Sequence, residues 1–176
     1  MGEDPLALET RRRVYDVVRR TPGLSAREIQ RAAQTGWGET AYHLERLEDS
    51  HLLHRERGGH QDYFFTASVP LGDRTLLRLA RSPSARRILV TLLDAPEITF
   101  VEVAHRTGLS PSRVSIHLRR WLETGIVESG RREALRIYRI PDRDRVMRLV
   151  IAYRSGYADG WVDRFIDSWA EMFAPG

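Results

Sequence analysis

Residues 110–127 read SPSRVSIHLRRWLETGIV and contain the clearest structural signals of the chain. A serine followed by a proline is typical of a helix start, because serine caps free backbone amides and proline fits the first helical position. From there Val114, Leu118 and Trp121 recur at helical spacing and predict one apolar face. After the helix, Ile126-Val127 predict a short apolar strand.

The segments on either side complete a unit of three helices and a hairpin. Residues 84–94 predict a first helix. The second begins at a capping box over residues 99–102 and stops at Thr107-Gly108. Residues 136–138 predict the strand that returns from a charged hairpin tip. Three helices followed by a two-stranded hairpin form a winged helix, whose second and third helices are the helix-turn-helix.

The first half of the chain repeats this pattern 74 positions earlier. The matched positions keep similar residue types over most of the unit: Val14 with Ile88, Pro22 with Pro96, Glu28 with Glu102, His43 with His117, Leu53 with Val127. Near the end the shift becomes 75, where Tyr63 meets Tyr138, and we attribute the change to one extra residue in a hairpin tip.

The first copy shows the same succession of signals. Residues 6–20 predict its first helix, and residues 25–28 form a second capping box. The second helix is predicted to stop at Thr35-Gly36. The third helix is predicted from the core positions Ala41, Leu44 and Leu47. The wing is predicted from a strand at Leu52-Leu53, a tip at Gly58-Gly59 and a return strand over residues 63–65.

Residues 110–127 resemble the recognition-helix signature of ArsR- and MarR-like winged-helix regulators, and residues 40–47 are a looser copy. The arrangement over residues 6–140 is similar to that of archaeal two-module winged-helix regulators. The resemblance implies a mainly helical protein with small β-hairpin wings that binds DNA. We therefore divide the chain as follows: a first module at 6–68, a partly helical linker at 69–83, a second module at 84–140 and a C-terminal helical dimerisation region at 141–174.

The second module offers a surface suited to a DNA groove. In winged-helix proteins the third helix enters the major groove, and the wing lies along the backbone or minor groove. Arginine pairs with guanine or phosphate, serine with either, and isoleucine contacts a thymine methyl. With the apolar face inward, the third helix turns these residues outward: Ser112, Arg113, Ser115, Ile116, Arg119 and Arg120. The wing adds three arginines suited to phosphates: Arg131, Arg132 and Arg136.

The first module differs in charge. Its third helix has four carboxylates against the single Arg46: Glu39, Glu45, Glu48 and Asp49. We therefore expect the second module to read DNA, while the first contacts backbone, holds a partner or senses a signal. Its candidate DNA contacts are Arg27, Arg31, Arg46, Arg55 and Arg57. Arg19-Arg20 and Arg86-Arg87 are interpreted as solvated faces balanced by nearby carboxylates.

The histidines give no metal site. His43 and His117 occupy matching positions before a core leucine, where a metal or pH sensor is one reading. We favour the other reading, a half-buried residue that seats the helix. His51 and His54 lie three positions apart at a helix-to-strand junction, with no evident thiol or carboxylate partner. We expect neither a metal nor another cofactor.

The tail over residues 142–173 is predicted to be an amphipathic helix, since Val146, Leu149, Val150 and Tyr153 follow helical spacing. Aromatic residues then recur every fourth position: Tyr153, Tyr157, Trp161, Phe165, Trp169 and Phe173. Each such step drifts by about 40°, so the stripe turns about 200° and no flat surface covers it. We expect a break near residues 155–160, or two buried faces, and dimerisation through the aromatics. An aromatic ligand pocket is the rival reading.

Composition narrows the class of protein. All 28 Lys+Arg residues of the 176-residue chain are arginine, the formal net charge is +4, and there is no cysteine. The absence of cysteine excludes disulfides and thiolate chemistry. We find no signal peptide, no apolar run of membrane-spanning length, no phosphate-binding glycine loop and no nucleophile elbow. We therefore expect a soluble, cytoplasmic protein that is not an enzyme.

Three functions remain after this reasoning. We favour a homodimeric, sequence-specific transcriptional regulator that binds double-stranded DNA. A sequence-independent architectural DNA-binding protein would share the basic surface. A tandem winged-helix protein-interaction module would explain the acidic third helix of the first copy. A small-molecule effector is compatible with these residues, although none of them indicates one.

Overall fold

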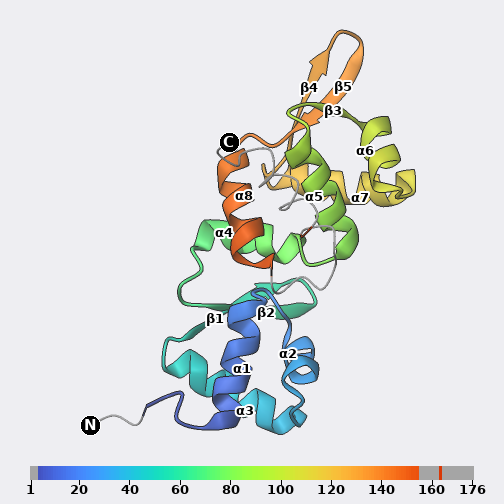
Figure 1. Ribbon diagram of the computed structural model, residues 1–176. Coiled ribbons are helices and arrows are strands. Elements are labelled where there is room, and N and C mark those ends of the chain that lie inside the picture. Colours follow the sequence, from blue (N-terminus) through green and yellow to red (C-terminus); the bar gives the residue numbers. More distant parts are fainter. Residues whose placement is uncertain (1–3, 155–162, 164–176) are drawn as a thin grey trace. The chain divides into compact units, whose positions relative to one another are not determined.

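The computed structural model describes residues 4–154 and residue 163, and the chain divides into two compact units between Arg78 and Leu79. The first unit contains three helices, a hairpin and a further helix (Figure 1): α1 Glu9–Arg20, α2 Ala26–Ala33, α3 Trp37–Asp49, β1 Leu53–Gly58, β2 Gln61–Thr66 and α4 Leu71–Leu79. The second unit repeats the succession and adds a C-terminal helix: α5 Pro83–Asp94, β3 Ile98–Thr99, α6 Phe100–Thr107, α7 Pro111–Glu123, β4 Glu128–Arg132, β5 Leu135–Arg139 and α8 Arg143–Ala152. The predicted fold class, mainly helical with small antiparallel hairpins, is confirmed.

Each unit has its own apolar core. In the first unit Val14 and Val18 of α1, Ile29 of α2 and Leu44 and Leu47 of α3 form one buried cluster. In the second unit the matching helices bury the following side chains: Ile88, Leu89, Leu92, Val103, Val114, Leu118 and Trp121. The third helix of each unit is therefore held by one face only, and its other face is left to solvent.

Capping boxes start the second helix of both units, as the sequence predicts. The Glu28 carboxylate accepts hydrogen bonds from the amide and hydroxyl of Ser25, at 2.9 and 2.6 Å. The Glu102 carboxylate accepts the same two bonds from Thr99, at 2.8 and 2.7 Å. These bonds satisfy donors that a helix N-terminus would otherwise leave unpaired.

The second helices end in the left-handed conformation, but only one of them ends at a glycine. In the second unit this residue is Gly108, with φ 64°. In the first unit it is Gln34, with φ 54°, and Gly36 lies two residues further on as the N-cap of α3. The predicted stop at Thr35-Gly36 is therefore wrong in detail, because a residue with a side chain adopts the strained conformation here.

The two hairpins have tips of equal length, which corrects the predicted change of shift. Gly58 pairs with Gln61, and Arg132 with Leu135, so two residues form each tip. Leu24 pairs with Phe64 in a single bridge, while Ile98 pairs with Tyr138 in β3–β5. The shift therefore stays at 74, and Phe64, not Tyr63, is the counterpart of Tyr138.

Two further predictions of local structure are wrong. The pair Ile126-Val127 precedes β4 and forms no strand, although Val127 is buried, and Leu52 likewise precedes β1. In α3 the predicted core position Ala41 is exposed, while Thr40 and His43 are buried beside Leu44 and Leu47. The short polar Thr40 is accommodated because its hydroxyl donates to the Gly36 carbonyl, at 2.9 Å.

Within the predicted tail, the described residues form one helix, α8. Asp142 caps α8 by accepting from the Arg145 amide at 3.1 Å, and Val146 and Val150 are buried. The helix ends at Ala152, and Tyr153 follows as its half-buried C-cap. The other aromatics proposed for dimerisation lie outside the described residues: Tyr157, Trp161, Phe165, Trp169 and Phe173. Within residues 4–154 and 163, no helix is long and apolar enough to cross a membrane.

Candidate nucleic-acid interface

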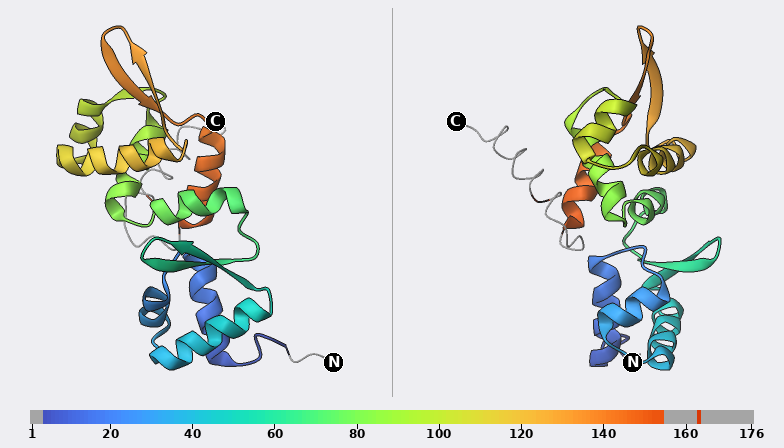
Figure 2. Two further views of the ribbon diagram at one scale, coloured as in Figure 1. Left: turned by 180° about the vertical axis from the view of Figure 1, so that it is seen from behind. Right: turned by 90° about the vertical axis from the view of Figure 1, so that its right-hand side faces the viewer.

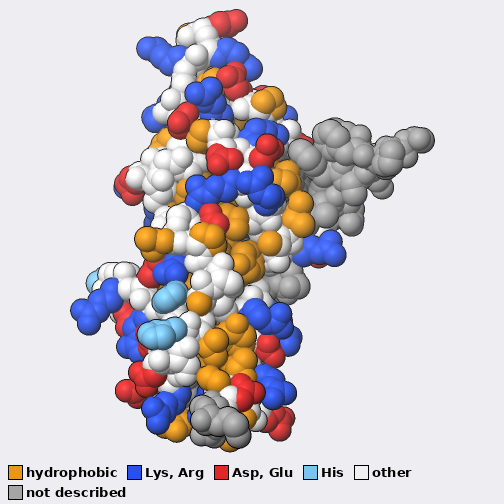
Figure 3. Space-filling model, turned by 90° about the vertical axis from the view of Figure 1, so that its left-hand side faces the viewer, with side chains coloured by type: hydrophobic (Ala, Val, Ile, Leu, Met, Phe, Trp, Pro, Cys, Tyr) orange, Lys and Arg blue, Asp and Glu red, His pale blue; other side chains and the backbone are white. Residues whose placement is uncertain are grey.

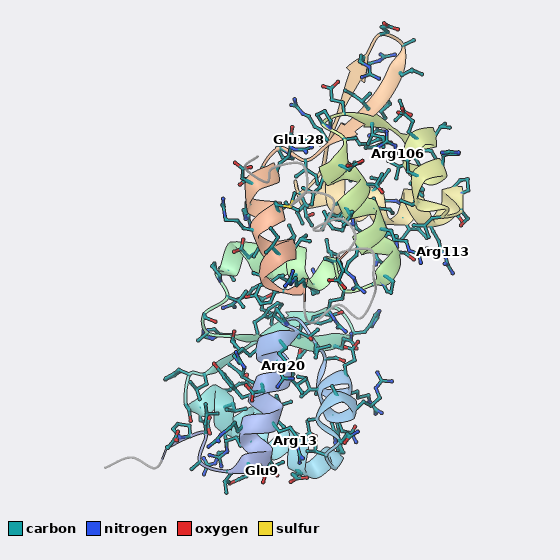
Figure 4. All side chains as sticks on the ribbon, viewed as in Figure 1. Glu9, Arg13, Arg20, Arg106, Arg113 and Glu128 are labelled. Carbon is teal, nitrogen blue, oxygen red and sulfur yellow. The ribbon has the colours of Figure 1, made fainter. Side chains whose placement is uncertain are left out.

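The outer face of α7 is open to solvent. Val114, Leu118 and Trp121 point into the core of the second unit, with at most 2% of each side chain exposed. All six residues proposed to face DNA are exposed: Ser112, Arg113, Ser115, Ile116, Arg119 and Arg120. Figure 4 shows Arg113 projecting from this helix. The helical period thus presents three guanidinium groups on one surface.

These guanidinium groups have no carboxylate partner within the part of the chain that the structure describes. Arg113, Arg119 and Arg120 form no ion pair there. By contrast, Arg106 on the preceding helix α6 pairs with Asp94 at 3.2 Å. An unpaired arginine can bind phosphate or a guanine edge without first breaking an internal contact.

The wing of the second unit is a second basic surface. Strands β4 and β5 extend away from the helices of this unit (Figures 1 and 2), and all of β4 is exposed. Arg131 and Arg136 are register partners on the two strands, so like charges stand opposite each other. Such a pair destabilises a hairpin unless an anion neutralises it. Figure 3 shows basic side chains on both sides of the projecting hairpin, with acidic ones at its tip and among them.

Two of the three wing arginines proposed to bind DNA have internal contacts. Arg132 lies 3.9 Å from the Glu97 carboxylate, with more than half of its side chain exposed. Arg136 donates to the Ser129 hydroxyl at 3.0 Å, and its guanidinium lies 5.4 Å from the centre of the Tyr138 ring. The ring and the hydroxyl hold the Arg136 side chain on one face of the hairpin.

The arginines of the first unit are arranged differently. Arg46 pairs with Asp49 at 3.4 Å, and Arg55 pairs with Glu48 and with Asp62, the latter at 3.8 Å. These carboxylates keep the pKa of Arg55 above its ordinary value, with the Glu48 hydrogen bond as the main cause. Arg27, Arg31 and Arg57 are exposed and form no ion pair among the described residues.

A groove of about 430 Å³ lies between α2, α3 and the wing of the first unit, and sequence reasoning missed it. Its apolar floor is formed by Leu44 and Phe64, which are almost fully buried. Arg27, Trp37, Arg55 and Asp62 are among its rim residues. The guanidinium of Arg27 lies 5.6 Å from the Trp37 ring centre. The one sequence signal was a tryptophan at a position that the helix exposes.

Both repeat-matched histidines lie at the inner edge of the third helix. His43 is 5% exposed, and its Nδ1 has no hydrogen-bond partner in the described structure. Burial, followed by the charge of Arg11, lowers the pKa of His43. His117 is half-buried, and burial together with Arg120 and Arg113 lowers its pKa. No group of three potential metal ligands occurs among the described residues.

One predicted surface arginine is instead internal. Arg19 is solvated and pairs with Asp16 at 3.0 Å, in line with the expectation. Arg86 is only 6% exposed and donates to the carbonyls of Ala80, at 3.1 Å, and Arg81. The guanidinium thus satisfies chain carbonyls before α5, a role that helical periodicity did not reveal.

These features define the class of protein: the chain contains two helix-turn-helix domains with small β wings. Residues 8–77 match a family described as an N-terminal HTH domain, and residues 81–128 match the family described as winged helix-turn-helix DNA-binding. Each match falls wholly within one of the compact units.

Two particular proteins are similar to this chain. An uncharacterized HTH-type transcriptional regulator of Methanocaldococcus jannaschii is 27% identical over 127 residues, which are 72% of this chain. The match spans only 32% of that relative's length. Among solved structures, reduced HlyU from Vibrio cholerae matches with 20% identity and a TM-score of 0.37, over 59% of this chain and 90% of that one.

Proposed function

We propose that the chain is a sequence-specific, DNA-binding transcriptional regulator that inserts α7 into the major groove and lays its wings on the backbone. One observation supports this most: α7 exposes Arg113, Arg119 and Arg120 on one face without a carboxylate partner among the described residues. Arginine at such a face is the commonest reader of guanine, and the wing arginines supply phosphate contacts.

The comparisons support the same reading. The family matched by residues 81–128 is described as DNA-binding, and the relative from Methanocaldococcus jannaschii is named as a transcriptional regulator. The sequence of α7 leads us to group the chain with ArsR- and MarR-like regulators.

The proposal also covers the oligomeric state and the cellular location of the chain. We infer a cytoplasmic homodimer that reads an inverted repeat, with the contact made by the C-terminal aromatics. The chain acts without a cofactor and has no catalytic role in this proposal. Its polar side chains gather on helix faces and wings, where they serve binding.

Selection from a random duplex pool, followed by binding measurements over a salt series, tests the proposal. We expect an enriched sequence and an affinity that falls steeply with salt, because arginines displace counterions from the phosphates. Arg113→Ala and Arg119→Ala should weaken specific binding by about 10-fold or more. Arg19→Ala is the control, since Arg19 is an exposed arginine that pairs with Asp16 and is not among the candidate DNA contacts.

The possible results separate the rival functions. Binding without an enriched sequence would indicate an architectural protein that coats DNA. Wild-type affinity in both Arg113→Ala and Arg119→Ala would show that α7 does not read the duplex, and the proposal would fail.

A further inference from the structure

We propose that the first unit uses its third helix and the adjoining groove to bind a basic polypeptide segment of another protein, one with a large apolar residue flanked by arginine or lysine. This surface occupies the place that we propose to contact DNA in the second unit. The inference concerns a different unit from the proposed DNA site and does not depend on that site.

The charge of the third helix is reversed between the two units. With the shift of 74, Glu39 takes the place of Arg113, and Glu45 takes the place of Arg119. All four side chains are exposed. Over its exposed positions α3 has three carboxylates against one arginine, while α7 has three arginines against one carboxylate. A surface of this sign repels phosphate and attracts cations.

Two arginines on or beside this helix are already held by carboxylates, whereas Arg27 of α2 lies against the Trp37 ring. Arg46 is paired with Asp49, and Arg55 is held by Glu48 and Asp62. Glu45 also acts on Arg55 electrostatically, so carboxylates outnumber the guanidinium at this edge of the groove. Phosphate would have to displace these carboxylates, whereas an incoming cation would join them.

The groove supplies the apolar half of a peptide site. Its floor of Leu44 and Phe64 lies under an opening of about 430 Å³, large enough for one bulky side chain. Trp37 on its rim is 52% exposed, and Tyr42 on the same helix is 49% exposed. The corresponding positions of α7 are Pro111 and Ile116. Exposed tryptophan and tyrosine are the residues that contribute most to protein interfaces.

Charge and shape together specify the partner. The groove lining carries Asp62 as well as Arg27 and Arg55, and Glu48 and Glu45 act on Arg55 from α3. A segment whose apolar side chain lies on the Leu44–Phe64 floor would meet these three carboxylates on the Arg55 side. Cations there gain Coulomb attraction, while carboxylates would be repelled. Charge complementarity therefore favours a basic peptide over an acidic peptide or a nucleic acid.

A peptide selection on the full-length chain tests the inference. A phage-displayed random 12-residue library is panned against the protein, and the most enriched peptide is labelled for anisotropy measurements. We expect apolar residues flanked by arginine or lysine. Glu45→Gln should lower the affinity about fivefold, and Trp37→Ala about 30-fold. Arg119→Ala, the matched change on α7, should leave peptide binding unchanged, and Glu45→Gln should leave DNA affinity unchanged.

Several outcomes would overturn the inference. These are an acidic or uncharged consensus, no enriched peptide, or full peptide affinity in Glu45→Gln. A loss of DNA affinity in Glu45→Gln would also overturn it, because the face would then contact the duplex. Circular-dichroism melting shows that each variant is folded, and Glu45→Gln keeps the test valid should Trp37→Ala unfold. A DNA-binding chain without a peptide site would leave the proposed function intact.

Discussion

The carboxylate of Glu102 accepts hydrogen bonds from both donors of Thr99, the backbone amide at 2.8 Å and the hydroxyl at 2.7 Å. These bonds fix the start of α6, the first helix of the second helix-turn-helix. The amide bond, followed by the hydroxyl bond, lowers the pKa of Glu102 from its ordinary value of 4.5. The contribution to stability is therefore complete above about pH 4.5 and is lost as the pH falls through the lowered value.

Glu102→Gln should reduce the loss of stability that the wild type shows as the pH falls through the lowered pKa of Glu102. Glutamine can still accept at the capping box, so the fold is retained, but it does not titrate. The measurement is the free energy of unfolding by urea from neutral pH to about pH 3. Glu133→Gln, at the exposed wing tip, is the control and should keep the wild-type curve shape. If the free energy of unfolding of Glu102→Gln fell as steeply at acid pH as that of the wild type, the Glu102 cap would contribute nothing to the acid dependence.

Gln34 is strained at φ 54°, where Gly108 ends the corresponding helix at φ 64° without strain. Gln34→Gly should stabilise the first unit by about 1 kcal/mol, and Gly108→Ala should destabilise the second by about 1 kcal/mol. Space is not the cause at Gly108, because a Cβ there would meet no atom within 4 Å.

Thermal melting of both variants measures this difference. Ala32→Gly is the control, since Ala32 is exposed and lies within α2, where glycine should destabilise. Because Gln34 but not Ala32 has a positive φ, we expect Gln34→Gly to raise the melting temperature and Ala32→Gly to lower it. A loss of stability in Gln34→Gly would contradict it.

Burial lowers the pKa of His43 below its ordinary value of 6.5. Between the two values the unfolded chain binds more protons, so the free energy of unfolding rises with pH there. Stability from the neutral imidazole is full above about pH 6.5 and is lost as the pH falls through the lowered value. His43→Gln should remove the His43 part of this dependence and leave the part due to His117, whose pKa is also lowered by burial.

The readout for His43 is the slope of stability against pH between about pH 5 and about pH 7. His54→Gln changes an exposed histidine and is the control for the loss of one imidazole. A slope in His43→Gln as steep as in the wild type, or a shallower slope in His54→Gln, would assign the effect to another group.

Local signals predicted much of the fold. The serine-proline start and the spacing of Val114, Leu118 and Trp121 suffice to place α7 and its exposed face, because periodicity and capping act within a few residues. The position of Gln34 was missed, since sequence rules favour glycine at a helix end. The burial of Arg86 was missed because its partners are carbonyls, which leave no sequence signature.

The candidate site was predicted to a similar degree. Exposure of the α7 arginines follows from helical geometry alone. The groove over Leu44 and Phe64 does not, because it needs the wing to lie beside α3 at a definite register. The pairing of Arg55 with Glu48 was likewise beyond the sequence, since it joins a strand to a helix.

Exchanging the charges of α3 and α7 tests the DNA site of the second unit and the peptide site of the first unit in one experiment. The double variant Glu39→Arg/Glu45→Arg gives α3 the arginines that α7 has at the same positions. We expect tighter binding to random duplex DNA, with a salt slope steeper by about 2, because two more phosphates are neutralised. Glu9→Arg/Asp16→Arg on α1 adds the same charge elsewhere and should change the slope less. The converse variant Arg113→Glu/Arg119→Glu should abolish DNA binding while peptide binding persists. Equal slopes in the two arginine double variants would mean that net charge, not the third-helix face, governs contact with DNA.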